Sequence, residues 1–178
     1  MQNKLIANIP ISVTLFSVTL IVYILYSVSV LKSVPCEKDA KSNFLSIFVH
    51  TDCKHALLNL YAVYALSRVE KRIGSKQFGC LLFFLITFNV LLETIMHRYK
   101  DVKCSIGLSG ILFGIAVWEM VTIEEITPSL IASIVSLVAL PSVVGANIST
   151  SGHVIGSISG LVGGLLYNKL NFWLIPKY

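Results

Sequence analysis

Residues 107–117 read Gly-Leu-Ser-Gly-Ile-Leu-Phe-Gly-Ile-Ala-Val, an apolar stretch that opens on a serine with glycines close on both sides. The chain around it has 178 residues, of which 55% are hydrophobic and 13% are charged. A soluble domain carries about 25% charged residues, so this composition predicts a polytopic membrane protein. A serine between glycines at the mouth of a lipid-embedded helix is unusual for packing alone, which makes Ser109 a candidate functional residue.

Six apolar segments predict an all-α fold, a bundle of six transmembrane helices that forms a single domain over residues 1–178 with no soluble domain. The first segment is too long for the apolar region of a secretory signal peptide, about 7 to 15 residues, and is predicted to be retained. A polar loop of residues 32–54 follows it, and Gly74 is predicted to cap the second helix. The predicted helices cover residues 10–31, 55–69, 78–95, 109–121, 128–144 and 152–170.

The fourth predicted helix is the shortest, and its length sets the depth of Ser109. The helix from Ser109 to Glu124 rises roughly 23 Å at 1.5 Å per residue, whereas the hydrocarbon core of a bilayer is roughly 30 Å thick. With Glu124 and Glu125 at one interface, Ser109 lies roughly 7 Å below the other. Water must reach a hydroxyl at that depth through a protein-lined cavity, because irregular backbone cannot face lipid.

The net charge of +5 suits contact with an anionic lipid surface and does not call for nucleic acid as a partner. Lys and Arg residues divide evenly between the two sides of a six-span topology, seven on each, so the positive-inside rule alone does not decide the orientation. The densest basic cluster, residues 68–76, favours a cytosolic N-terminus.

Polar residues at the start of the second predicted helix are candidates for function. His55 and Asn59 are four residues apart and share one helix face, and polar side chains in membrane helices usually face the bundle interior or a water cavity. Asn59 is equally compatible with an interhelical hydrogen bond worth about 0.6 kcal/mol. His50, His55 and the Asp52-Cys53 pair are zinc-binding residue types, but their spacing lacks the His-Glu-x-x-His pattern, so no metal site is predicted.

His153 opens the sixth predicted helix, in which glycine recurs every fourth residue at positions 152, 156, 160 and 164. Such a stripe allows close helix packing, which is a sufficient reason for Gly160 and Gly164. Packing against the fourth helix would also bring His153 within reach of Ser109. A neutral imidazole can take the serine proton and return it to a leaving amine. No carboxylate stands in an obvious third position, so a dyad is predicted rather than a triad.

A tetrahedral intermediate at Ser109 would need hydrogen-bond donors for its oxyanion. The backbone N–H of Ser109 at a helix N-terminus is one candidate, and the side chains of Asn59 and His55 are two others. Gly107 and Gly110 leave room beside the serine for backbone and substrate.

These motifs, in this order, resemble the rhomboid intramembrane serine proteases, and most closely their bacterial six-helix form. The resemblance extends over roughly residues 50–167. It rests on five features: His50 with His55 and Asn59, Glu70-Lys71-Arg72-Ile73-Gly74, Gly107-Leu108-Ser109-Gly110, Ala146-Asn147, and Gly152-His153 with Gly156 and Gly160.

The resemblance implies a role for each matching residue. Ser109 corresponds to the nucleophile and His153 to its base. Asn59 and His55 correspond to residues on the oxyanion and substrate side, next to Gly107. The supporting positions are His50, which would help to hold the first loop, Phe113, which replaces an aromatic residue (often tyrosine) stacked under the imidazole, and Gly110 and Gly156.

The resemblance also implies an intramembrane serine endopeptidase that cleaves transmembrane-helix substrates near the extracytosolic membrane surface. Both termini would be cytosolic and the site would open to the extracytosolic side. The expected partners are transmembrane proteins and the lipid bilayer, with no cofactor, metal or nucleic acid, and the oligomeric state stays open. The alternative is a catalytically inactive rhomboid-like protein that binds or chaperones membrane clients, although inactive relatives typically lack the serine or the histidine.

The first loop departs from the family pattern. The Trp-Arg pair that is common there is not evident, and residues 42–45 read Ser-Asn-Phe-Leu. Two of Cys36, Cys53 and Cys104 would be able to form a disulfide in an oxidising compartment, but free thiols are preferred without a geometry that supports a bridge.

Overall fold

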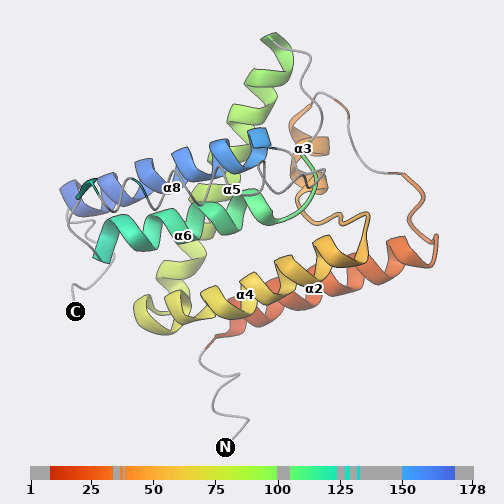
Figure 1. The fold of residues 1–178 in the computed structure, drawn as a ribbon, viewed down its shortest axis with the longest axis horizontal. Helices are drawn as coiled ribbons and strands as arrows, with labels where there is room; N and C mark the ends of the chain where they lie inside the picture. The colour runs from red at the N-terminus through yellow and green to blue at the C-terminus, as the bar shows by residue number, and fades with distance from the viewer. Residues whose placement is uncertain are drawn as a thin grey trace, which may run out of the picture.

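The computed structural model of the chain describes residues 9–33, 37, 39–99, 105–123, 127–128, 132 and 150–170. Regular structure in these residues is entirely helical, which confirms the predicted all-α class for this part of the chain. Figure 1 shows α2 (Pro10–Ser27), α3 (Ala40–Ser46), α4 (Cys53–Ile73), α5 (Ser75–Tyr99), α6 (Ser109–Ile123) and α8 (Thr150–Leu170).

Two pairs of helices lie side by side, α2 with α4 and α6 with α8 (Figure 1). α5 crosses behind α6 and α8, steeply inclined to them, and it contacts each of the other five described helices. Leu82 and Leu85 of α5 pack in one apolar core with Ile111 and Ile115 of α6. Because lipid is as apolar as these side chains, close packing rather than exclusion of water holds membrane helices together.

α4 is longer at both ends than the predicted helix of residues 55–69. It begins at Cys53 because the Asp52 carboxylate accepts a hydrogen bond from the His55 N–H at 2.8 Å and caps the helix. It continues to Gly74, whose φ of +83° closes the last turn and confirms the predicted C-terminal cap. The predicted end was too early because charged side chains occupy the last turns of the helix.

The remaining boundaries differ from the predicted ones by small amounts. α2 ends at Ser27 rather than at residue 31, because Ser29 adopts a left-handed φ of +61° and interrupts the helix. α5 extends beyond the predicted range of 78–95 at both ends. α6 and α8 match their predicted ranges to within two residues at each end.

The N-terminal end of α2 is capped from a distant part of the chain. Ile9 provides no side-chain cap. Instead, the buried Glu70 carboxylate of α4 accepts hydrogen bonds from the backbone N–H groups of Ile11 and Ser12, at 3.1 and 2.7 Å. A carboxylate at this position satisfies free N–H groups and opposes the helix dipole, so the contact fixes the start of α2 to the end of α4.

The first loop contains a short helix, α3, so the prediction of a loop over residues 32–54 was wrong at its centre. The Asp39 carboxylate caps α3 by accepting hydrogen bonds from the Lys41 and Ser42 N–H groups at 2.8 and 3.0 Å. The hydrogen bonds from Ser42 hold the pKa of the Asp39 carboxyl below its usual range.

α3 is attached to α5 by a polar contact. The Asn43 amide nitrogen donates a hydrogen bond to the Thr94 hydroxyl at 2.9 Å. The buried side chains of α3 are all polar, namely Ser42, Asn43 and Ser46. No apolar periodicity therefore marks this helix in the sequence.

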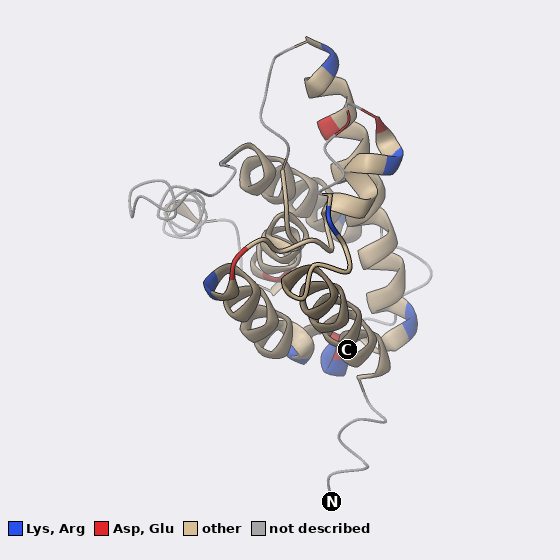
Figure 2. Ribbon diagram, turned by 90° about the vertical axis from the view of Figure 1, so that its right-hand side faces the viewer, with Lys and Arg blue, Asp and Glu red and all other residues tan. Residues whose placement is uncertain are grey.

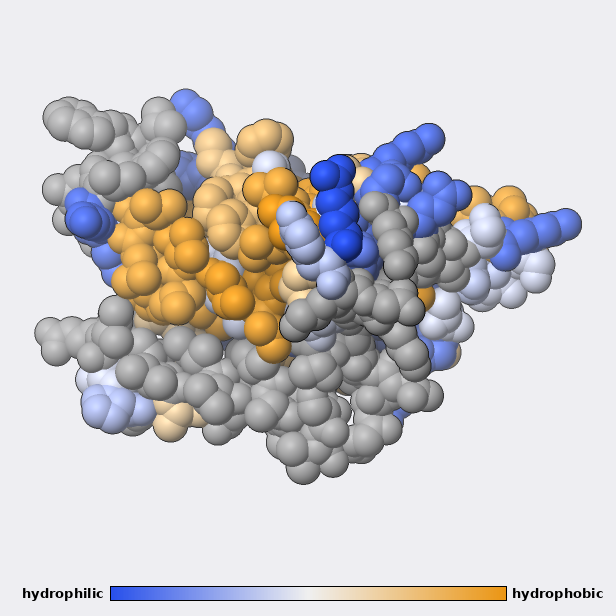
Figure 3. Space-filling view, turned by 90° about the horizontal axis from the view of Figure 1, so that it is seen from above, coloured by the Kyte–Doolittle hydropathy of each residue, from blue (hydrophilic) through white to orange (hydrophobic). Residues whose placement is uncertain are grey.

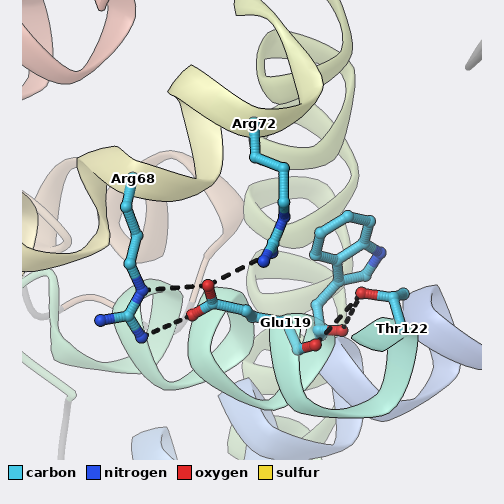
Figure 4. A network of polar contacts seen from close by, with 5 residues as sticks. Arg68, Arg72, Glu119 and Thr122 are labelled. Carbon is cyan, nitrogen blue, oxygen red and sulfur yellow. Dashed lines mark hydrogen bonds and ion pairs between the residues drawn. The ribbon is translucent and has the colours of Figure 1, made fainter. Parts of the chain in front are cut away.

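α4 and α6 are joined near their C-terminal ends by an ion-pair network (Figure 4). The Arg68 guanidinium donates two hydrogen bonds to the Glu119 carboxylate, at 3.0 and 2.8 Å, and Arg72 adds a third at 3.2 Å. The Glu119 side chain is 8% exposed, whereas that of Arg68 is 65% exposed. The acidic side of the network is therefore buried between the helices and the basic side reaches the surface.

Several features of the described helices suit a bilayer. By length and composition α2 and α5 are able to cross a membrane, and α6 is apolar but shorter. Charged residues lie mostly near helix ends (Figure 2), and apolar side chains form a continuous area on the face seen in Figure 3. The predicted helix of residues 128–144 falls almost entirely outside the described residues, and Ala146-Asn147 lies wholly outside them.

Candidate active site

Ser109 lies at the first position of α6, where the incoming loop becomes helical. The Leu112 N–H closes the first turn onto the Leu108 carbonyl at 3.1 Å. The Ser109 N–H therefore belongs to the first turn, whose N–H groups have no partner within the helix and form the positive end of its dipole. Negative charge that develops on an atom beside Ser109 would be stabilised at this position.

His153, in the first turn of α8, lies next to the Ser109 hydroxyl. Its Nε2 atom is 3.0 Å from Ser109 Oγ, and the residue is 2% exposed. Nε2 accepts the hydroxyl proton when the ring carries its own proton on Nδ1. Nδ1 has no hydrogen-bond partner among the described residues, so in that part of the chain no carboxylate extends the pair to a triad.

Facing glycines allow α6 and α8 to approach closely enough for this contact. A Cβ atom on Gly156 would overlap the Gly110 carbonyl, and one on Gly160 would overlap the Gly114 carbonyl. Any larger side chain would push the two helices apart. The close crossing therefore depends on small residues in both helices, and it positions His153 one turn before Gly156.

Phe113 supports the imidazole from one turn further along α6. The rings of Phe113 and His153 are stacked, with centroids 4.2 Å apart and planes inclined by 22°. Stacking restricts rotation of the imidazole. The predicted aromatic support is thus in contact with the predicted base.

Gly107 shapes the loop that leads to Ser109. Its φ of +99° is a left-handed value that side chains with a Cβ atom rarely adopt. A Cβ at this position would lie 2.7 Å from His55 Cε1 and 3.2 Å from His50 Nε2. The Gly107 N–H donates a hydrogen bond to the Ser46 carbonyl at the end of α3, at 3.0 Å, so the first loop holds the backbone in front of Ser109.

His50 also holds this loop. Its Nε2 accepts a hydrogen bond from the Leu108 N–H at 3.4 Å, and its Nδ1 donates to the Phe48 carbonyl at 3.2 Å. A neutral ring with the proton on Nδ1 satisfies both contacts. Burial, together with the neighbouring His55, lowers the pKa of His50 to about 4, so the ring stays neutral near pH 7.

His55 and Asn59 lie on the α4 side of the site. His55 is beside Gly107, as the short distance to a Cβ at that glycine indicates. The Asn59 amide nitrogen donates a hydrogen bond to the His55 carbonyl at 2.9 Å. His55 Nε2 and Asn59 Oδ1 are buried and have no partner among the described residues, so both groups keep polar atoms available in the neighbourhood of the serine loop.

Asn89 of α5 also contributes to the site, although its role was not predicted from the sequence. Its amide nitrogen donates hydrogen bonds to the Ser159 hydroxyl of α8 at 2.9 Å and to the Leu85 carbonyl at 2.8 Å. A Cβ on Gly110 would lie 3.3 Å from Asn89 Oδ1. An amide within the apolar segment 78–95 was the available signal, because polar residues inside membrane helices usually have a partner or a function.

The cysteines and histidines of the first loop do not form a metal-binding cluster in the described structure. No group of three or more His, Cys, Asp or Glu side chains lies close enough to hold a metal among those residues. Cys53 is a free, exposed thiol. Cys36 and Cys104 lie outside the described residues.

Comparisons with known proteins identify the family to which the chain belongs. The family model of the rhomboid domain matches residues 38–170. Protein L523 of Acanthamoeba polyphaga mimivirus, which is named as a rhomboid protein, is 30% identical over 122 residues, covering 67% of this chain and 71% of its own length. The chain therefore belongs to the rhomboid family. It is an integral membrane protein of a family of intramembrane serine proteases that also has inactive members.

Proposed function

We propose that this protein is an intramembrane serine endopeptidase that uses Ser109 and His153 as a catalytic dyad. The observation that carries the proposal is the 3.0 Å distance between Ser109 Oγ and His153 Nε2, in a chain of the rhomboid family. A distance of this size is within the range for proton transfer from a nucleophile to its base.

The first half of the reaction forms an acyl-enzyme. Ser109 Oγ attacks the carbonyl carbon of the scissile peptide bond while His153 Nε2 takes the hydroxyl proton. The carbonyl oxygen becomes an oxyanion in the tetrahedral intermediate. The intermediate then collapses, the C–N bond breaks, and His153 gives its proton to the leaving amine.

The second half restores the enzyme. A water molecule attacks the acyl carbon while His153 takes one of its protons, and the ester bond to Ser109 breaks as the proton returns to Oγ. Both halves create an oxyanion at the same place. The Ser109 N–H, at the N-terminus of α6, and the side chains of His55 and Asn59 are the proposed donors for it.

The substrates are proposed to be transmembrane proteins, cut close to the extracytosolic membrane surface. The proposed topology has six spans in a single domain, of which the fifth is the predicted helix of residues 128–144. Both termini are proposed to lie in the cytosol. The apolar α2 and α5 support spanning helices. The basic residues 68–76, which include Arg68 and Arg72 at the end of α4, support a cytosolic location for that end.

Reconstitution in liposomes with a single-span reporter substrate tests the proposal. Ser109→Ala and His153→Ala are each expected to abolish cleavage while the protein still accumulates and stays folded. Ser157→Ala is the matched control, because the buried Ser157 hydroxyl has no partner among the described residues and its removal is expected to leave cleavage intact.

A fluorophosphonate probe supplies a second measurement that does not depend on the substrate chosen. Wild-type protein should be labelled and Ser109→Ala protein should not. Normal cleavage by Ser109→Ala protein would overturn the proposal. Absence of labelling and cleavage in folded wild-type protein would favour the alternative of an inactive rhomboid-like protein.

A further inference from the structure

A buried carboxyl group lies where three segments meet beside the proposed dyad. Glu93 is on α5, is 8% exposed, and takes no part in the reaction steps above. An acidic side chain inside a membrane helix is costly, and it is usually retained because it has a partner and a role. The contacts of Glu93 indicate what that role is.

The first contact reaches the loop that carries the nucleophile. The Ser105 hydroxyl lies near the Glu93 carboxyl group, because both would be neighbours of a Cβ placed on Gly152, and it acts as a hydrogen-bond donor to that group. Ser105 is four residues before Ser109, at the start of the segment in which Gly107 bonds to the Ser46 carbonyl and Leu108 to His50. Glu93 therefore connects this loop to α5, in addition to the loop's contacts with α3 and His50.

The second contact reaches the segment that carries the base. Gly152 directly precedes His153 and packs on the same pair of side chains. A Cβ on Gly152 would lie 3.0 Å from Ser105 Oγ and 3.6 Å from Glu93 Oε1. The first turn of α8 therefore packs against the Glu93–Ser105 pair.

α5 makes a similar connection one helical turn earlier. Asn89 and Glu93 are four residues apart and share a helix face. Asn89 bonds to Ser159 in the middle of α8, whereas Glu93 lies at the beginning of α8. Two polar side chains on one face of α5 thus hold α8 at two points along its length, near its beginning and near its middle.

We propose that Glu93 is a positioning residue that holds the Ser105 loop against the first turn of α8 and so fixes the distance between Ser109 and His153. The inference rests on the proposed function of that dyad. Glu93 does not touch the reacting atoms. Its effect is geometric, because a misplacement of about 1 Å in a catalytic group can lower a rate by about 10²-fold.

Substitutions of Glu93 test this role by changing its shape or its hydrogen bonding. In Glu93→Leu protein the acceptor for Ser105 is lost, and kcat for the reporter and the rate of fluorophosphonate labelling at Ser109 should both fall about tenfold to hundredfold. KM should change little, since substrate contacts remain. Glu93→Gln keeps a carbonyl acceptor and should restore most of both rates.

The control and the partner variant make the test specific. Leu91→Ala changes an exposed residue of the same helix and should match the wild type. Ser105→Ala should reproduce the kcat loss of Glu93→Leu. The double variant should be no slower than either single variant, because both remove one and the same contact.

The outcomes separate this inference from the proposed function. If Ser109→Ala abolishes labelling but Glu93→Leu protein reacts at the wild-type rate, the positioning role is wrong and the dyad stands. If Glu93→Leu only lowers the thermal midpoint while the folded fraction reacts normally, Glu93 is a structural brace and the inference is overturned. If folded wild-type protein is neither labelled nor active, the proposed function fails first and the positioning role with it.

Discussion

The imidazole of His153 lies flat against the ring of Phe113, with 4.2 Å between their centroids and 22° between their planes. The two residues come from different helices, α8 and α6, and the same imidazole reaches Ser109 with its Nε2 atom. Phe113 therefore limits the orientations in which the ring can present Nε2 to the serine hydroxyl.

Replacing Phe113 should test the value of that support. Phe113→Leu removes the stacked ring, and an aromatic pair contributes about 0.5 to 1.5 kcal/mol beyond its buried area. We expect kcat for the reporter to fall about twofold to tenfold, whereas Phe113→Tyr should stay near the wild type. Phe83→Leu, at a site that is 74% exposed on α5, is the control. An equal loss in Phe83→Leu protein would rule out a specific role for stacking.

The crossing of α6 and α8 should not tolerate a methyl group at its tightest point. In Gly156→Ala protein the new Cβ overlaps the Gly110 carbonyl, so the helices must separate and His153 must move away from Ser109. We expect labelling by a fluorophosphonate to fall at least tenfold, because small displacements of reacting groups are costly. Gly79→Ala is the matched helical control, since its Cβ would meet only the tip of the Ile11 side chain, at 3.1 Å. Equal labelling of the two variants would contradict this account.

The loop before Ser109 should depend on a glycine at position 107. Gly107→Ala imposes a Cβ on a left-handed backbone and presses it against the His55 ring. Strained backbone of this kind costs about 1 to 3 kcal/mol, and the thermal midpoint of unfolding measures the loss. Adding His55→Ala should relieve the clash but not the backbone strain, so the double variant should recover stability only in part. Full recovery would mean that the conformation itself is not strained.

The ion-pair network between α4 and α6 should stabilise the fold through its geometry. Arg68→Lys keeps the charge but loses the bidentate hydrogen bonding to the Glu119 carboxylate. We therefore expect the free energy of unfolding to fall by about 1 kcal/mol. The stabilisation should weaken in high salt because Arg68 is largely exposed. Arg98→Lys, at an exposed position near the end of α5, is the control and should be neutral at any salt concentration.

Acid should destabilise the protein through His50. The ring has an ordinary pKa of 6.5 when unfolded and about 4 when folded, so between these values the unfolded chain binds more protons. The free energy of unfolding therefore falls as the pH drops from about 6.5 toward 4, and the contribution of the neutral ring is complete only above that window. His50→Gln removes this titration. Its unfolding free energy, measured across the window, should decline less steeply than that of the wild type, and parallel curves would contradict the assignment.

The apolar pattern predicted the helices well and their ends less well. The start of α6 at Ser109 could be predicted because glycine, serine and an apolar run stand together there. The last turn of α4 could not, because Lys71 and Arg72 interrupt the apolar pattern although the helix continues through them. Helix ends at a membrane surface are charged as a rule, so hydropathy tends to place them too early.

Contacts between distant segments were the harder part of the site to predict. The pairing of Ser109 with His153 was expected from the glycine stripe and from the family resemblance. α3 was missed because its buried side chains are polar and because its key contact, the Ser46 carbonyl, is a backbone group that any residue would carry. Glu93 was not predicted to have a role, since its partners Ser105 and Gly152 become neighbours only in the folded chain.

The Glu70 carboxylate at the start of α2 has a consequence for the order of assembly. Glu70 is 59 residues beyond Ile11, whose backbone N–H is one of the two that the carboxylate caps. Because Glu70 belongs to α4, α2 is synthesised before the carboxylate that caps its N-terminal end. The start of α2 can be capped only after the chain has grown through α4, so the final position of α2 depends on a helix that is made later.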